Sequence, residues 1–362
     1  MRAKRFMSTA LVLVGLGAMT VAPIAGASTA IAAKKSTPLS RGLAYYQGKT
    51  LNFIVSSNAG SAYDIEARSV TTAMAAYLHA TINVEDIPGG SGITGQDLLE
   101  SSPKDGLTFG FLNGGVIIYN ILEHNPSVNF NPARMDFLAG VSAPNHAFAA
   151  TPGSPYQTFA SLLTATAANP VTLLTDNGSI TSIEQKLILD TFGIHYRIIT
   201  GYSNSSTQLA GFLRGDGMGM FSAVSTFGPY LQSHLAIPLA KMYPMTAPVN
   251  YAAVTANVPT IPQLERKYPA KNHFQATAYK VLEAVDPSSG EPFVTAANTP
   301  PDYLAALRAA AVSVLSSSSM KATFAQQGHL VDLVSGAVAK QRYINSLAML
   351  QKYSVALGIT AN

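Results

Sequence analysis

The segment GSGITG, residues 90–95, places three glycines at the spacing of a dinucleotide-binding loop. In that motif the glycines bring the backbone close to a pyrophosphate, and an acidic residue about twenty positions later binds the ribose. Counting on from the motif leads to Gly110–Asn113, where neither Asp nor Glu stands. The segment is therefore interpreted as a glycine-rich turn whose backbone closely approaches a ligand or a neighbouring loop. Nucleotide binding is the minor alternative.

Residue patterns that support catalysis are missing from the sequence. The chain has no cysteine, which excludes disulfides, thiolate metal sites and a cysteine nucleophile. No G-x-S-x-G, H-E-x-x-H or P-loop motif occurs, and the seven histidines are scattered without metal-ligand spacing. The sequence therefore predicts no catalytic residue, no metal and no cofactor. Each histidine is interpreted as a surface or hydrogen-bonded core residue, and His146→Ala is expected to affect ligand binding little.

Small polar loops follow several expected strands and are more informative. In an open α/β sheet, ligands bind outside the carboxyl ends of the strands, where helix N-termini present free N–H groups and a positive dipole end. Loops of Ser, Asn and Gly can surround a carboxylate with donors without any Arg. One such loop is equally well an ordinary turn, but four of one character favour a binding site. They read SSNAGSAY from Ser56, PGGSG from Pro88, NGG from Asn113 and DNGS from Asp176.

Apolar runs and helical periodicity alternate along the chain, which predicts an α/β fold whose first sheet is mostly parallel. The second alternating unit follows a Pro- and Gly-rich stretch near residues 141–154, and the pattern loosens again between Ala247 and Gln275. We therefore predict one domain from 34–145 and 275–362, and a second from 146–274. Expected strands cover residues 51–55, 81–87, 107–113, 171–175, 196–200 and 217–221, and expected helices include 181–191, 206–214, 301–316 and 337–355.

The first residues have the pattern of a secretory signal peptide. Arg2, Lys4 and Arg5 precede a short apolar run, and small residues follow. The predicted signal covers residues 1–33, and an uncleaved membrane anchor is the alternative. Because no cysteine follows, a lipoprotein is excluded. The sequence thus predicts a soluble, exported protein.

Charge argues against a nucleic-acid partner. The formal net charge is +4, but residues 1–27 hold three basic residues and no acidic one, so the remaining chain carries only +1. No basic stripe is left to follow phosphates. Hydrophobic residues make up 48% of the chain, enough to exclude disorder, and charged residues only 12%.

A set of segments, in order along nearly the whole chain after the predicted signal, matches the motifs of one known family. The four stronger segments are IVSSNAGSAYDIEAR from Ile54, VEDIPGGSGITG from Val84, PKDGLTF from Pro103 and NFNPARMDF from Asn129. Weaker matches are NGS at 177–179, GYSNSS at 201–206 and VPTIPQL at 258–264. Together these segments resemble the substrate-binding proteins of tripartite tricarboxylate transporters, the Bug family. The segment from Ile54 keeps the family's Ile, Val, Gly and the final Asp-Ile-x-Ala-Arg, and the segment from Val84 keeps its Val-Glu, Pro-Gly and last Gly.

This resemblance implies a type II periplasmic-binding-protein fold, with two α/β domains that close on a ligand in the cleft between them. It implies a periplasmic, monomeric receptor that binds a small organic carboxylate and transiently contacts membrane transporter subunits. The second hypothesis is an enzyme or a ligand sensor built on the same scaffold, because a fold does not fix a function.

The family's ligand loops transfer to positions of this chain that are richer in hydroxyl groups than usual. The family's Pro-Phe-Pro becomes Ser56-Ser57-Asn58, its second Gly becomes Ser61, and its usual His and Asp become Ser182 and Ser222. These departures leave the class of ligand open. The resemblance implies a ligand site formed by Ser57, Asn58, Gly60, Ser61, Ala62, Tyr63, Asp64, Gly90, Asn113, Gly114, Gly178, Ser179, Ser182, Tyr202 and Ser222.

Overall fold

The computed structural model describes residues 36–122, 124–141, 146–176, 180–242, 252–289, 291–326 and 333–352. The chain divides into Met1–Ser36 and Thr37–Asn362, and every described helix and strand belongs to the second unit. The predicted signal segment, and the predicted ligand residues Gly178 and Ser179, lie outside the described residues. Among the described residues, no helix is both long and apolar enough to cross a membrane.

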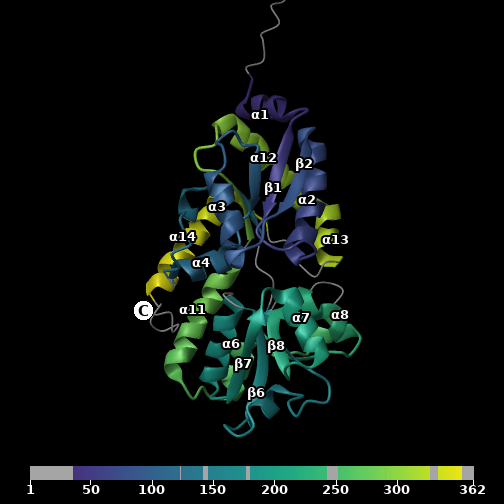
Figure 1. The fold of residues 1–362 in the computed structure, drawn as a ribbon, viewed down its shortest axis with the longest axis vertical. Helices are drawn as coiled ribbons and strands as arrows, with labels where there is room; N and C mark the ends of the chain where they lie inside the picture. Colours follow the sequence, from purple (N-terminus) through teal and green to yellow (C-terminus); the bar gives the residue numbers. More distant parts are fainter. Residues whose placement is uncertain are drawn as a thin grey trace, which may run out of the picture. The chain divides into compact units, whose positions relative to one another are not determined.

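The first sheet has six strands in the order β11-β4-β10-β3-β1-β2. Two of them, β1 and β2, lie side by side in Figure 1. β1 lies between β2 and β3 and is parallel to both, as the sequence predicts. β10 pairs antiparallel with β3 and β4, and β11 pairs antiparallel with β4, so β4 runs in the same direction as β1, β2 and β3. Four of the six strands therefore share one direction, as predicted for a mostly parallel sheet, and β10 and β11 run opposite to them. The strands are β1 (Thr50–Val55), β2 (Thr81–Asp86), β3 (Thr108–Phe111), β4 (Asp136–Val141), β10 (Glu291–Thr295) and β11 (Val334–Ser335).

Helices from both ends of the chain pack on this sheet. α12 and α14 both contact β4, and α12 also contacts α1 and α2. The predicted helix at 301–316 is confirmed, and its C-cap Ser317 is followed directly by the next helix, which begins at Ser318. The elements are α1 (Pro38–Tyr46), α2 (Ala62–Leu78), the 3₁₀ turn η1 (Gly90–Gly92), α3 (Ile93–Ser101), α4 (Gly114–Leu122), the 3₁₀ turn η2 (Pro132–Arg134), α12 (Pro301–Ser316), α13 (Ser318–Gln326) and α14 (Gly336–Lys352).

The second sheet has five strands in the order β7-β6-β8-β5-β9. β6 lies between β7 and β8 and is parallel to both, whereas β5 is antiparallel to β8 and β9. The three strands that the sequence predicts here are present, and β5 and β9 are additional. The strands are β5 (His146–Ala150), β6 (Val171–Asp176), β7 (Tyr196–Tyr202), β8 (Gly219–Ala223) and β9 (Ile237–Lys241).

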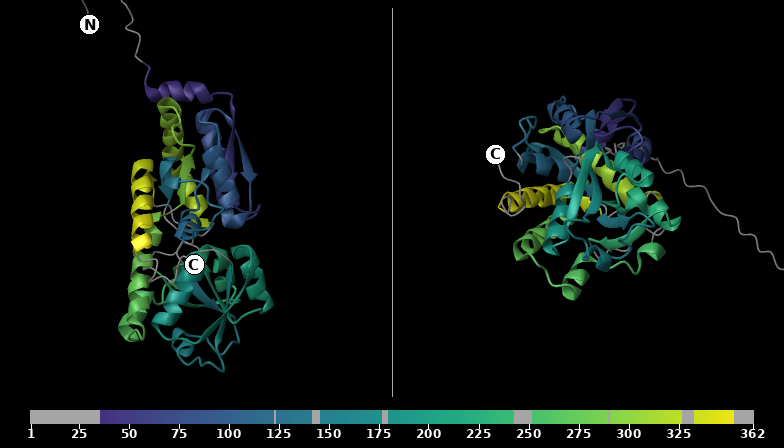
Figure 2. Two further views of the ribbon diagram at one scale, coloured as in Figure 1. Left: turned by 60° about the vertical axis from the view of Figure 1, so that its left-hand side comes forward. Right: turned by 60° about the horizontal axis from the view of Figure 1, so that its bottom comes forward.

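One long helix, α11, contacts helices that belong to both parts of the fold. It packs against α6, which follows β6, and also against α14 and α4 (Figures 1 and 2). The predicted boundary at 274/275 falls within its first turn, and the domain division stays a prediction. The helices are α5 (Phe159–Leu162), α6 (Ile180–Thr191), α7 (Ser205–Arg214), α8 (Val224–Gln232), α9 (Ala252–Thr255), α10 (Ile261–Lys267) and α11 (His273–Ser289).

Local sequence explains where several helices begin. Ser61, Thr158, Asn204 and Thr260 are N-caps whose side chains accept a backbone N–H of the first turn. Such caps satisfy donors that the helix leaves unpaired and stabilise it by about 1 kcal/mol each. Helix starts in this chain are therefore locally encoded, and they place the loops that precede them.

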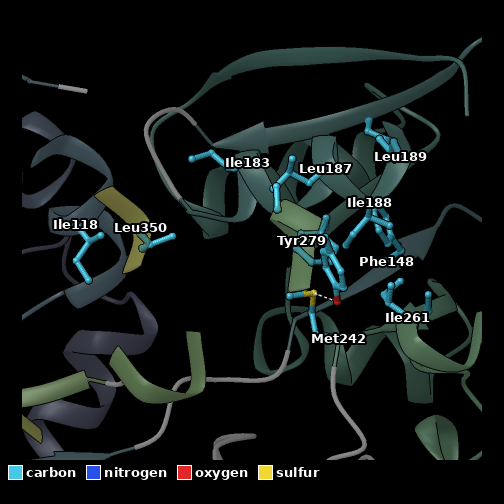
Figure 3. Close-up of a cluster of buried hydrophobic side chains, with 14 of the residues drawn as sticks. Ile118, Phe148, Ile183, Leu187, Ile188, Leu189, Met242, Ile261, Tyr279 and Leu350 are labelled. Atoms are coloured by element: carbon cyan, nitrogen blue, oxygen red, sulfur yellow. Dashed lines mark hydrogen bonds between the residues drawn. The ribbon is translucent and has the colours of Figure 1, made fainter. Parts of the chain in front are cut away.

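Buried aromatic and aliphatic side chains fill the space between helices and sheets. In the first sheet the rings of Phe53 and Phe109 meet edge to face at 5.0 Å. Around α6 and α11, Tyr279 is fully buried and its hydroxyl donates to Met242 Sδ at 3.1 Å (Figure 3). A buried tyrosine needs such a partner because an unpaired hydroxyl costs about 1–3 kcal/mol. The strand ends thus emerge from a rigid core.

Candidate functional site

The loop between β1 and α2 carries the largest group of predicted site residues. Ser61 is the N-cap of α2, and the Asp64 N–H donates to its hydroxyl at 3.3 Å. Asp64 turns back on the loop, and its Oδ2 accepts the Gly60 N–H at 2.8 Å. Ser57 is half-buried and Asn58 is exposed. The loop is therefore closed on itself by Asp64, while its outer residues remain accessible.

The family resemblance places Gly60 at the ligand, where a missing side chain would permit close approach of the backbone. The structure supplies a different reason for glycine. A Cβ at Gly60 would meet no atom within 4 Å, but φ is +76°, a conformation that L side chains rarely adopt. The requirement at this position is thus conformational, and crowding by the rest of the protein is not part of it.

Asp64 belongs to a small charge cluster beside the loop. Arg68 Nε lies 2.6 Å from Asp64 Oδ1, and Arg68 Nη2 lies 3.0 Å from Asp86 Oδ2. Burial and the nearby charge of Asp64 raise the pKa of Asp86, and Arg68 offsets part of this rise. One guanidinium therefore serves two carboxylates. Its charge is committed within the protein, so a bound anion would have to rely on other donors.

We expect Asp64→Ala to lower the free energy of unfolding by about 1–3 kcal/mol, because it removes the acceptor of a loop N–H and the charge that stabilises the start of α2. Asp64→Asn keeps an oxygen for the Gly60 N–H and should lose clearly less. Urea denaturation of both variants measures this. Equal losses for Asn and Ala would show that the carboxylate charge, and not the loop hydrogen bond, is what counts.

The glycine-rich segment of residues 90–95 packs closely against the loop that follows β1. A Cβ at Gly92 would lie 3.1 Å from the backbone oxygen of Ser56, and a Cβ at Gly95 would lie 2.8 Å from Ser56 Oγ and 2.9 Å from the Ile87 oxygen. These glycines let η1 and α3 approach the end of β1. Gly90, a predicted site residue, is exposed with φ +54°. The segment thus supports the β1–α2 loop.

The end of β3 lies beside the same region. Asn113 is half-buried, and its carbonyl accepts the Ile117 N–H at 3.0 Å, which begins α4 together with the buried Gly114. The ring of Tyr63 meets the edge of Phe111, the last residue of β3, at 6.0 Å. The structure therefore brings the loops after β1 and β3 together, as expected for adjacent parallel strands.

The described site residues predicted near the second sheet are either buried or already hydrogen-bonded to a neighbouring side chain. Ser182 in the first turn of α6 and Ser222 in β8 are buried. Tyr202, at the end of β7, donates its hydroxyl to Asp216 at 2.8 Å, and burial together with Asp216 raises the pKa of this tyrosine. Arg214 and Tyr202 both lower the pKa of Asp216. The Tyr202 hydroxyl is thus already engaged in a polar cluster with Arg214, the last residue of α7, and Asp216, which follows that helix.

A buried hydrogen-bonded pair, His146 and Glu184, lies next to Ser222, and the sequence analysis did not identify Glu184 as the partner of His146. His146, the first residue of β5, is 5% exposed, and its Nδ1 lies 2.8 Å from Oε2 of Glu184 on α6. Glu184 is fully buried. His146 pairs with Ala223 in the sheet, beside Ser222. The interpretation of His146 as a hydrogen-bonded core residue agrees with these contacts, but 38 residues of separation gave no signal for Glu184.

Within the parts of the chain that the structure describes, no group of three or more His, Asp or Glu side chains could hold a metal ion. The region instead offers hydroxyl groups, amides and backbone N–H groups at helix starts. Such groups bind an anion or a polar organic molecule by hydrogen bonds.

Comparisons with known proteins place this arrangement in a structural class. No protein-family model matches the sequence, and no curated protein matches it either. Solved structures do match, with TM-scores near 0.7. The fold is that of a two-domain periplasmic binding protein.

Three solved structures, one of them the periplasmic binding protein BugD, illustrate the match. The protein BugD is 16% identical, with a TM-score of 0.71 over 88% of this chain and 100% of its own. Rpa4515 of R. palustris, solved with adipate, is 18% identical, with a TM-score of 0.71 over 87% and 99%. MatC of Rhodopseudomonas palustris, solved with bound malate, is 17% identical, with a TM-score of 0.68 over 85% and 99%. The expected fold is therefore confirmed, at identities that establish the fold alone.

Proposed function

We propose that this chain is an extracytoplasmic solute-binding receptor of the Bug type. It captures a small organic carboxylate in a cleft between two domains and delivers it to a tripartite tricarboxylate-type membrane transporter. The observation that carries the proposal is the β1–α2 loop, whose Gly60 and Asp64 hold a hydroxyl- and amide-bearing turn over the start of a helix. The similarity in fold to proteins solved with adipate and malate supports it. The similarity to the periplasmic binding protein BugD favours a receptor over an enzyme.

The ligand charge is matched mainly without cationic side chains. Arg68 is already paired with two carboxylates, so the available donors are N–H groups at the start of α2 and the side chains of Ser57 and Asn58. Charge-assisted hydrogen bonds contribute about 1.5–3 kcal/mol each, so two or three of them are sufficient for micromolar binding. Gly178 and Ser179 are proposed to complete the site from the second domain.

The proposal is tested by titrating malate and adipate into the protein lacking residues 1–33, using calorimetry. A second arm identifies small molecules that co-purify with the protein by mass spectrometry. We expect a dicarboxylate or related acid to bind with a micromolar Kd. Failure of both acids, together with a co-purified ligand that bears no carboxylate, would overturn the ligand class.

Ser57→Ala is expected to weaken binding of such an acid about ten-fold, or ~1.4 kcal/mol, because one hydrogen bond to a charged group is lost. The matched control is Ser101→Ala, an exposed residue on α3 whose hydroxyl donates to its own helix at Asp97 O. Calorimetry on both variants decides the matter. An unchanged Kd for Ser57→Ala would place the ligand away from this loop.

A further inference from the structure

Two glutamines occupy equivalent positions in the two sheets, although the sequence shows no internal repeat. The order strand–helix–strand–helix–strand occurs in β1-α2-β2-α3-β3 and again in β6-α6-β7-α7-β8, and in both the first strand lies between the other two. Gln96 is the fourth residue of α3, and Gln208 is the fourth residue of α7. Both side chains are 0% exposed. The two units therefore share their strand order and also a buried glutamine at the same position of the second helix.

Gln96 ties the ends of β1 and β3 together just beyond their ladder. The last paired residues of these strands are Ile54 and Gly110. One residue past Gly110, the Phe111 carbonyl accepts from Gln96 Nε2 at 2.7 Å, and the same nitrogen contacts Ser56 Oγ. One amide group therefore holds both strand ends at the point where they separate into loops.

Gln208 makes the corresponding contacts in the second sheet. The β6–β8 ladder ends at Leu174 and Met220. Gln208 Nε2 donates to the Leu174 carbonyl at 2.8 Å and to the carbonyl of Phe221, one residue past Met220, at 3.2 Å. Each glutamine thus connects the first and third strand of its unit, and the acceptor on the third strand is a backbone carbonyl in both cases. At the first strand, Gln96 contacts the Ser56 hydroxyl and Gln208 donates to the Leu174 carbonyl.

The physical role of this arrangement follows from where parallel strands separate. A buried carbonyl without a donor costs about 1–3 kcal/mol, and a neighbouring strand can no longer supply one beyond the ladder. Both donors of a planar amide have fixed directions, so one glutamine sets the spacing of two strand ends. The Oε1 atoms of Gln96 and Gln208 are buried and accept no hydrogen bond from any described residue. The contribution of these side chains therefore lies in their donors.

We propose that Gln96 and Gln208 are positioning residues that hold the ligand loops of the two domains. Gln96 fixes the start of the loop that carries Ser57 and Asn58 and the end of β3 before Asn113. Gln208 fixes the end of β8 beside Ser222 and the last part of β6. The positioning stands on the hydrogen bonds of the two amides, and its effect on ligand affinity rests on the proposed function.

The test uses Gln96→Met and Gln208→Met, which keep the side-chain length and remove the donors. The matched control is Gln157→Met. Gln157 Nε2 also donates to two backbone carbonyls, of Thr151 at 3.1 Å and Ser154 at 2.7 Å. It follows the end of β5, where Ala150 pairs with the first residue of β8, at the opposite end of that strand from Ser222 and Ala223. The control therefore removes the same chemistry far from the ligand loops.

Hydrogen–deuterium exchange of the ligand-free proteins tests positioning by itself. In Gln96→Met we expect exchange to accelerate at least about five-fold in residues 56–61 and 112–117 and to stay unchanged after β8. Gln208→Met should show the reverse, and Gln157→Met should change neither region. Uniform acceleration over a whole sheet, or none at these loops, would overturn the proposal. If either Met variant does not fold, Gln96→Asn and Gln208→Asn replace it, because the shorter amide cannot reach both strand ends.

Calorimetry with malate and adipate then tests the consequence for binding. We expect Kd to rise about ten-fold in each Met variant and to stay unchanged in Gln157→Met. Unchanged Kd values in all three variants, with an acid that binds the wild type, would contradict a role in binding. If neither acid binds the wild type, the proposed ligand class fails, while the exchange experiment still decides whether the glutamines position the loops.

Discussion

Gly95→Val is expected to abolish ligand binding and to lower the free energy of unfolding by ~1–3 kcal/mol. Replacing a glycine within a helix by alanine normally stabilises the protein by about 0.5–1 kcal/mol. Here a Cβ would lie 2.8 Å from Ser56 Oγ, 2.9 Å from the Ile87 oxygen and 3.0 Å from Ser56 Cα. Two of these three atoms belong to the backbone, so the strand end must move, and overpacking of this kind costs ~1–3 kcal/mol. The displaced segment leads directly into the loop that carries Ser57.

The measurement combines urea denaturation with calorimetry of malate and adipate. Gly95→Ala provides an intermediate step and is expected to destabilise as well, reversing the usual sign for a helical glycine. Ser101→Ala on the same helix is the control and should stay within about 0.5 kcal/mol of the wild type. A stabilised Gly95→Ala protein with unchanged ligand affinity would show that the contact with Ser56 is easily relaxed.

His146→Ala should cost about 1–3 kcal/mol of stability, since it removes the hydrogen-bond partner of the fully buried Glu184 side chain. The sequence predicts little effect of this substitution on ligand binding, and the buried pair predicts a clear effect on folding. Replacing both members, in His146→Leu with Glu184→Leu, removes both buried polar groups. The double variant is therefore expected to lose less than the single one.

Urea denaturation of the single and double variants forms the test, with His195→Ala as the control because His195 is exposed. The control should change the free energy of unfolding by less than about 0.5 kcal/mol. If His146→Ala behaves like the control, or if the double Leu variant loses as much as the single one, the hydrogen bond between His146 and Glu184 does not carry the stability assigned to it.

The sequence by itself determined the elements whose signals are local. Alternating apolar runs predicted β1, β2, β3, β6, β7 and β8, and periodicity and Pro301 predicted α12. Side chains that cap helices, such as Ser61 and Asn204, act within three residues, so their effect is visible in the sequence. The resemblance of several segments to the Bug family indicated the fold in advance, which the solved structures then confirmed.

The tertiary structure alone decided how distant segments complete the sheets and the site. β10 joins β3 and β4 from about 150 residues further along the chain, and no local pattern specifies such a pairing. Glu184 finds His146, and Gln208 finds Phe221, only because helices fold back over their sheets. Buried polar side chains choose partners by proximity in space, and a single sequence records residue type but not distance. For that reason the glycines of residues 90–95 could be recognised as a close-packing turn, while Ser56, the residue they approach, could be identified only from the fold.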